Sequence, residues 1–457
     1  MSSLTSEQQH KKMTETPITP LLISLSLPAI ANMIMSSIYN IADTYFVTSL
    51  GERAIGAVGI VFSIQSFIQA LGFGVAMGCS SIVSRKLGEK DNQTANRFAS
   101  SAVLMGCILG LFIALFGLIF LDSLLFLIGA TQTILPYARD YAMIILLAAP
   151  VLCTSVVLTP LMRAEGKAIF SMFVGLSGGL INLILDPIFI FGFNMGVKGA
   201  AIATAISQVC GLLIGLSFYI FGKSVLKLSI HSISKNIKDY ILIIKTGAPT
   251  VFRQGLGGIA ITLLNVQVKV YGDAAVAAVS LANKVYMFIR SVILGVGQGF
   301  QHITGYNYGD HKYKRVKKVF VLAVIFGSTV ACIGGLFCGL FPSQIINIFG
   351  AQNQEVIDIG ANLLSFYAFA IPTLGFSSYV NMLYQSLGYV KSATFLASCR
   401  QGIFFIPLIL VLPKFFGLTG ILSVQPISDA LTCLISIPFC IWFMKKVLHI
   451  KEETVFQ

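Results

Sequence analysis

Apolar residues occur along this chain in long runs, and short polar segments separate one run from the next. Most runs hold about 20 residues or more, the length at which an α-helix crosses the hydrocarbon core of a bilayer. About twelve runs are expected to form such helices: 21–46, 55–82, 98–121, 138–162, 168–192, 197–221, 241–268, 275–303, 319–341, 358–386, 392–413 and 418–443. Because a membrane β-barrel needs short alternating strands instead, the pattern predicts an all-α polytopic membrane protein.

The runs form two copies of one six-helix unit. The segment "LGERAIGAVG" at 50–59 matches "YGDAAVAAVS" at 271–280, and Pro28 matches Pro249. Both pairs have the same shift, because 271 − 50 and 249 − 28 both equal 221. An even number of helices in each copy gives the two copies the same orientation in the membrane, which is the pseudo-symmetry of many secondary transporters.

This repeat defines the expected domain organisation. We predict an N-terminal six-helix lobe at 1–221, a cytoplasmic connecting loop at 222–245 and a C-terminal six-helix lobe at 246–457. The two lobes are expected to be pseudo-symmetric six-helix bundles that transport a substrate by alternating access.

The formal net charge of +13 is a topology signal in such a chain, because only 11% of its residues are charged, against about 25% in soluble proteins. Basic residues gather on alternate loops: Arg85, Lys86, Lys90, Arg97, Arg163, Lys167, Lys223, Lys227, Lys235, Lys238, Lys245, Lys312, Lys314, Arg315, Lys317, Lys318, Lys445, Lys446 and Lys451. The positive-inside rule then places both termini on the cytoplasmic side of the membrane. We expect this membrane to be the plasma membrane, the inner membrane of a bacterium or archaeon. The basic segment "HKYKRVKK" is a short loop between spans, so no nucleic-acid partner is expected.

Two carboxylates, Asp43 and Asp186, lie inside apolar runs, where an unpaired charge costs at least ~3 kcal/mol. At the shift of 221 their counterparts are Leu264 and Pro407, so only the first copy keeps these acids. One interpretation is that each acid lies at the end of a span and contacts headgroup water. The asymmetry between the copies favours the other interpretation, a specialised ion-binding site in the first lobe.

Both acids belong to polar stripes with helical spacing. The stripes comprise Asn32, Ser36, Tyr39 and Asp43 in the first span, Gly175, Gly179, Asn182 and Asp186 in the fifth, and Thr204, Ser207 and Gly211 in the sixth. Such stripes must face protein or water, either as a close helix–helix interface of small residues or as a cavity. We expect a cavity, with Asn32, Ser36 and Tyr39 in contact with substrate.

Two prolines are expected to act as hinges. A proline has no N–H to donate, so Pro187 leaves the Leu183 carbonyl without its helical partner, one turn from Asp186. Pro28 does the same to the Ser24 carbonyl in the first span, where a bend would couple to protonation of Asp43.

The second half is cationic within its apolar runs. It carries Arg253, Lys284, Arg290 and Arg400, with Asp429 in the last span. Two interpretations stay open: internal ion pairing, with Asp429 as the partner of one cation, or a positively charged wall that binds anionic groups.

Sequence motifs give no indication of an enzyme. The nine cysteines lie mostly in apolar spans without CxxC spacing, and the five histidines form no HExxH or similar metal pattern. No hydrolase, kinase or ATPase motif appears, so no cofactor is expected beyond a coupling ion. No metal is expected beyond Na⁺ bound at Asp43 and Asp186.

Several motifs together resemble the multidrug and toxic compound extrusion (MATE) family. They are "YNIADTYFV", "NLILDPIFIFGFNMGVKGAAIAT", "RQGIFFIPLILVLP" and "RKLGEKD", and the resemblance covers essentially the whole chain. The acids confined to the first half resemble the prokaryotic DinF-like branch. That resemblance implies a cation or proton site in the first lobe, at Asp43, Tyr141, Asn182, Asp186 and Thr204.

The resemblance implies drug efflux driven by inward movement of H⁺ or Na⁺. Because an apolar cavity with a few carboxylates attracts amphipathic organic cations, we expect such cations as substrates, and we expect the transporter to be a monomer in the lipid bilayer. A lipid-linked oligosaccharide flippase of the same superfamily is the alternative, favoured by the cationic second half. A passive channel would need a continuous polar path or a filter, and the sequence shows neither a ring of acids nor a carbonyl-filter motif.

Overall fold

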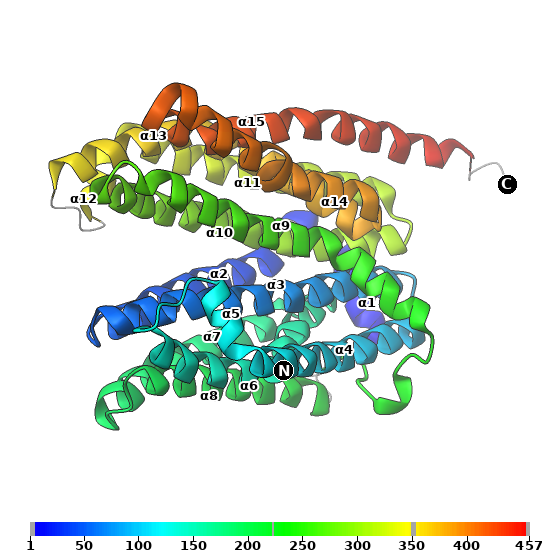
Figure 1. Ribbon diagram of the computed structural model, residues 1–457. Coiled ribbons are helices and arrows are strands. Elements are labelled where there is room, and N and C mark those ends of the chain that lie inside the picture. The colour runs from blue at the N-terminus through cyan, green and yellow to red at the C-terminus, as the bar shows by residue number, and fades with distance from the viewer. Residues whose placement is uncertain (1–4, 222–223, 349–352, 454–457) are drawn as a thin grey trace. The chain divides into compact units, whose positions relative to one another are not determined.

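The computed structural model (Figure 1) describes residues 5–221, 224–348 and 353–453. Within these ranges, the side chains of residues 40, 41, 43–45, 48, 52 and 447–453 are not described. All regular secondary structure of the described residues is helical.

Helices follow one another with short connections. The first half of the chain contains α1 (Ser6–Glu15), α2 (Ile18–Thr48), α3 (Glu52–Gly88), α4 (Asn92–Ile119), α5 (Leu121–Leu127), α6 (Leu135–Ala164), α7 (Ala168–Pro187), the π-helix η1 (Ile188–Gly192), α8 (Gly196–Ile220) and the 3₁₀-helix η2 (Ile230–Ser232). The second half contains α9 (Ile237–Lys269), α10 (Asp273–Gly309), α11 (Tyr313–Leu340), α12 (Pro342–Ile348), α13 (Gln354–Leu387), α14 (Val390–Ser398), the π-helix η3 (Cys399–Phe405) and α15 (Ile406–Glu453).

Ten helical segments in the described part of the chain are long and apolar enough to cross a membrane. The last of them, Val390–Lys446, has 57 residues and would measure ~85 Å if straight, more than twice the ~30 Å hydrocarbon core. Its helical backbone is interrupted at Gly417, where φ is 56°, so the segment is long enough for two passes. With this division and the 33-residue α9, 10 + 1 + 1 gives twelve long helices. The predicted polytopic all-α fold is confirmed.

The internal repeat is visible in the helix bounds. Shifted by 221 residues, α3 (52–88) becomes 273–309 and α4 (92–119) becomes 313–340, which are the bounds of α10 and α11. The turns repeat as well: φ is 95° at Gly51 and 91° at Gly272, and 56° at both Gly196 and Gly417. Glycine adopts positive φ without steric cost, so both copies use it at equivalent connections.

The chain divides into two compact units. The first unit comprises Met1–Thr16 and Leu27–Val251, and the second comprises Pro17–Ser26 and Phe252–Gln457. Helix α9 begins at Ile237, inside the segment where the connecting loop was expected, and its first half belongs to the first unit.

Close packing within the first unit depends on small residues, because lipid gives little hydrophobic driving force for helix association. A Cβ atom on Gly110 of α4 would lie 2.4 Å from the Cα atom of Pro150 on α6, so only glycine permits this approach. The opposite side of α4 exposes large apolar side chains, among them Phe112, Phe116 and Ile119. Such exposed residues are expected where a helix faces lipid.

Polar connections gather at one end of the first unit. Side chains of α4 hold the segment after α8 at this end. The backbone N–H groups of Lys227 and Ser234 donate to Asn96 Oδ1 and Ser101 Oγ. Arg97 also lies 3.2 Å from Asp239 at the start of α9. The basic loops of the first unit therefore meet at the same end of its helices.

Candidate functional site

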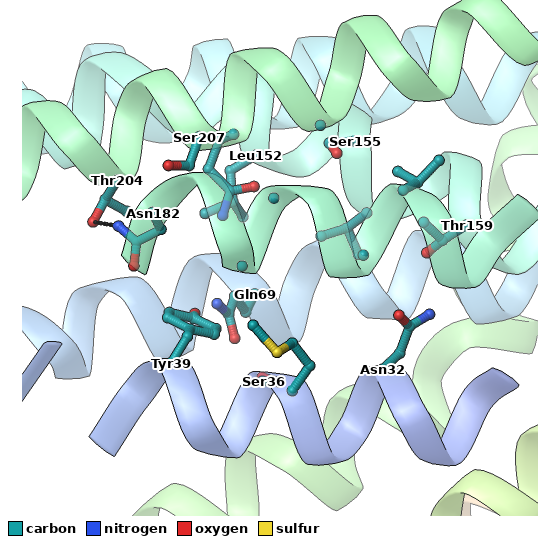
Figure 2. Close-up of a pocket in the computed structure, with 18 of the residues that line it drawn as sticks. Asn32, Ser36, Tyr39, Gln69, Leu152, Ser155, Thr159, Asn182, Thr204 and Ser207 are labelled. Carbon is teal, nitrogen blue, oxygen red and sulfur yellow. Dashed lines mark hydrogen bonds between the residues drawn. The ribbon is translucent and has the colours of Figure 1, made fainter. Parts of the chain in front are cut away.

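Five helices of the first unit, α2, α3, α6, α7 and α8, line a cavity of about 200 Å³ (Figure 2). Its polar lining consists of Asn32, Ser36, Tyr39, Gln69, Ser155, Thr159, Asn182, Thr204, Ser207 and Gln208. Its apolar lining consists of Met35, Phe73, Leu152, Val156 and Val174, with four glycines from α7 and α8. The cavity can hold polar and apolar parts of one ligand at the same time.

Glycines on α7 give the α2 side chains room to reach this helix. A Cβ atom on Gly175 would lie 2.5 Å from Asn32 Oδ1, and one on Gly179 would lie 3.3 Å from Met35 Cγ. The space next to Gly175 is taken by the Asn32 amide, whose Nδ2 donates to the Ser171 carbonyl at 3.1 Å. The glycines expected to form part of a polar stripe therefore let a polar α2 side chain bond to the α7 backbone.

A buried polar group links α7 and α8 at one end of the cavity. Asn182 Nδ2 donates to Asp186 Oδ1 at 3.2 Å and lies 3.4 Å from Thr204 Oγ1. Asp186 is fully buried, and Asn182 and Thr204 are buried as well. The spacing of four between Asn182 and Asp186 places both on one face of α7, where the amide orients the carboxylate.

Two amide oxygens on the cavity wall, Asn32 Oδ1 and Asn182 Oδ1, are buried and have no hydrogen-bond partner among the described residues. Figure 2 shows Asn182 beside Thr204, with Tyr39 and Asn32 on the facing helix. A buried acceptor without a partner is costly, so such atoms are expected to receive a hydrogen bond or a cation from a ligand. Amide, hydroxyl and carboxylate oxygens are suitable ligands for a hard cation such as Na⁺.

The structure brings most of the predicted site residues to this cavity. Asn32, Ser36, Tyr39, Asn182 and Thr204 line it. Asp186 joins the group through Asn182.

Four other predicted residues are not among the described residues that line the cavity: Tyr141, Asp43 and the two hinge prolines, of which Pro28 lies inside α2 and Pro187 ends α7. Tyr141 is buried on α6 within the apolar core and is not among the lining residues. Asp43 lies on α2, but its side chain is outside the described residues. The backbone of α7 changes from α- to π-helix directly after Pro187.

Four polar lining residues were missed: Gln69, Ser155, Thr159 and Gln208. Ser155 and Thr159 are four residues apart on α6, which is the spacing that identified the other stripes. Gln69 and Gln208 are single amides in apolar runs and could have been found by the cost of burying them.

A second buried acid, Glu165, lies between α6 and α7, outside the membrane-spanning segments. It accepts hydrogen bonds from Ser224 Oγ at 2.6 Å and from the Val225 N–H at 2.7 Å. Burial raises the pKa of Glu165 from 4.5 to about 7, although these hydrogen bonds and the charge of Lys167 favour the ionised form. This carboxyl therefore fastens the segment that follows α8.

We expect the thermal stability of the protein to fall as pH rises from about 4.5 to about 7, and to level off above that range. The folded state binds the Glu165 proton more tightly than the unfolded state, so ionisation favours unfolding. Glu165→Gln should remove this part of the pH dependence, measured as melting temperature in detergent at pH 5 and pH 8. Glu89→Gln, at an exposed carboxylate of the same end, is the control. An unchanged pH profile for Glu165→Gln would contradict the assignment.

The second unit contains a buried ion pair. Arg400 Nε lies 2.7 Å from Asp429 Oδ1, and Asp429 also accepts from Tyr286 Oη at 2.7 Å and Gln425 Nε2 at 2.8 Å. Arg400 donates a further hydrogen bond to Tyr286 Oη. Of the two interpretations left open for the cationic half, internal pairing therefore holds for Arg400.

Comparisons with known proteins agree on one family. A family model described as MatE matches residues 28–188 and 249–411. The multidrug export protein MepA of Staphylococcus aureus (strain bovine RF122 / ET3-1) is 27% identical over 433 residues, which are 94% of each chain.

Solved structures show the same fold. The outward-facing conformation of a multidrug resistance MATE family transporter of the MOP superfamily has a TM-score of 0.91 at 23% identity, covering 99% of this chain and 100% of that one. A MOP superfamily transporter from Pyrococcus furiosus, described as having a binding pocket of reversed polarity, has a TM-score of 0.89 at 24% identity, covering 97% and 98%. Since the family model matches both halves, this chain belongs to the MatE family of membrane transporters, which are not enzymes, and the resemblance drawn from its motifs is confirmed.

Proposed function

We propose that this protein is a multidrug efflux transporter that exports amphipathic organic cations in exchange for H⁺ or Na⁺. The observation that carries the proposal is the first-unit cavity. Its lining residue Asn182 donates a hydrogen bond to the buried Asp186 carboxylate, and the Asn182 amide oxygen has no partner among the described residues. The curated relatives named as multidrug export proteins support drug efflux as the activity.

The exchange depends on competition for one negative charge. Asp186 is fully buried, and the ionised form of a buried carboxylate is costly, so a bound cation or proton would lower this cost. An organic cation in the cavity would be attracted by the carboxylate and by the face of Tyr39, with a cation–π contribution of ~1 kcal/mol. Arrival of H⁺ or Na⁺ would remove the attraction of the carboxylate. One cation would therefore leave as the other enters.

Transport would follow alternating access by rocking of the two six-helix lobes, with hinges at Pro28 and Pro187. The monomer would lie in the plasma membrane with both termini in the cytoplasm. This orientation is supported by the basic loops that meet at one end of the first unit.

Efflux from proteoliposomes tests the proposal and separates the coupling ions. Ethidium is loaded, and a pH gradient and a Na⁺ gradient are imposed in separate experiments. We expect dye movement to follow one of the two gradients and to cease when that gradient is collapsed by an ionophore. Equal dye movement with and without either gradient would overturn the proposal of exchange.

A second candidate function is transport of a lipid-linked oligosaccharide. The arginines of the second unit favour it, because they are unusual in a transporter of cations. Protein that ignores ethidium in both gradients but moves a fluorescent polyprenyl-pyrophosphate lipid between leaflets would support this function over drug efflux.

A further inference from the structure

Three arginines lie deep within helices of the second unit. Arg253 is near the middle of α9, Arg290 is near the middle of α10, and Arg400 is in η3. Each arginine at the centre of a membrane helix costs about 3 kcal/mol on insertion scales. Such residues are retained where they have a partner or a ligand.

Of these three arginines, only Arg400 has an anionic partner among the described residues. Arg253 Nη1 donates to the neutral Asn381 Oδ1 at 3.0 Å, and Arg290 makes neither a hydrogen bond nor an ion pair with any described residue. Arg290 is close enough to Arg400, Arg253 and Asp429 to interact with all three electrostatically. Within the part of the chain that the structure describes, three guanidinium groups and one carboxylate therefore leave two positive charges without an ion-pair partner.

Arg253 and Arg290 differ from the Arg400–Asp429 pair in their burial. The side chains of Arg253 and Arg290 are only partly buried, whereas those of Arg400 and Asp429 are buried. Met287, one turn before Arg290 on the same face of α10, is exposed and apolar. A Cβ atom on Gly257, one turn after Arg253, would meet no atom within 4 Å. A ligand that reached both guanidinium groups would thus contact apolar surface beside them.

We propose that Arg253 and Arg290 bind the doubly charged oxyanion head of an amphipathic molecule, with the chemistry of a phosphate monoester. Guanidinium groups bind phosphate oxygens through paired, charge-assisted hydrogen bonds, and two of them match its charge of about −2. The exposed apolar residues accommodate an alkyl chain. This site is in the other unit from the cation cavity and takes ligands of the opposite charge, so it does not depend on the proposed efflux.

Binding of decyl phosphate to the purified full-length protein tests the proposal by calorimetry in detergent. Arg253→Gln and Arg290→Gln should each weaken binding at least about tenfold, the loss expected for a charge-assisted bidentate contact. Lys284→Gln is the matched control, because it removes the same charge from an exposed position on α10 and should leave the affinity unchanged. Equal affinity in all four proteins, or equal weakening in all three variants, would overturn the site.

A second measurement needs no variant. The second pKa of a phosphate monoester is about 6, so wild-type affinity for decyl phosphate should rise between pH 5 and pH 7.5. Decyl methyl phosphate, a diester with one charge throughout, should show no such rise. An identical pH response for both probes would exclude recognition of the dianion.

The same assay separates two sources of the head group. Inorganic phosphate tests whether the head alone suffices, and phosphatidic acid in nanodiscs tests a membrane lipid. Binding of either probe that depends on Arg290 supports the site and names its source. Ethidium efflux by the arginine variants is measured in parallel, so that failure of the anion site and failure of the efflux proposal are distinguished.

Discussion

Replacing Asp186 with asparagine is expected to abolish gradient-driven efflux and to leave the amount of folded protein close to that of the wild type. The amide keeps the shape of the side chain and can still accept the hydrogen bond from Asn182 Nδ2. It cannot bind a proton or neutralise a cation, so both exchanged ions lose their shared site. The measurement is ethidium efflux from proteoliposomes under a pH gradient and under a Na⁺ gradient.

A graded series makes this prediction sharper. Asn182→Ala should lower efflux about tenfold or more without abolishing it, because it removes one hydrogen bond to a charged group and keeps the charge. Asp122→Asn, at an exposed carboxylate paired with Arg139, should transport like the wild type. Wild-type efflux by Asp186→Asn would remove this acid from the mechanism.

The sequence was informative about this cavity because polar residues inside membrane helices are expensive. The spacing of Asn32, Ser36 and Tyr39 placed them on one face of a helix, and the structure finds all three on the cavity wall. Asn182 was likewise expected near Asp186, and the two are bonded. Periodicity within one helix is enough to predict a common face.

Contacts between helices are harder to predict, because residues far apart in the chain make them. Nothing in the spacing of Tyr141 shows which helices it contacts. The structure includes it in the buried cluster of the first unit and not among the residues that line the cavity. Glu165 lies in a short connection, and its partners Ser224 and Val225 come some sixty residues later. The pairing of Arg400 with Asp429 brings together η3 and α15 in a similar way.

Removing one partner of that ion pair should be strongly destabilising. Asp429 is 1% exposed and accepts hydrogen bonds from Arg400, Tyr286 and Gln425, so its carboxylate is buried among these three partners. Asp429→Ala leaves the buried Arg400 charge without its anionic partner, with only the Tyr286 hydroxyl to bond to among the described residues, and breaking a buried pair in this way costs about 3–5 kcal/mol. We expect a large fall in melting temperature and loss of folded protein during purification.

The double variant Arg400→Gln with Asp429→Asn decides whether the loss comes from the unpaired charge. It removes both charges and keeps amides that can bond to each other and to Tyr286, so it should be clearly more stable than Asp429→Ala and Arg400→Gln alone. Melting temperatures of the wild type, both single variants and the double variant, measured in one detergent at one scan rate, give the comparison. Single variants as stable as the wild type would show that the pair contributes nothing. A double variant less stable than either single variant would show that the hydrogen-bond geometry at Asp429, and not its charge, holds α15 and η3 together.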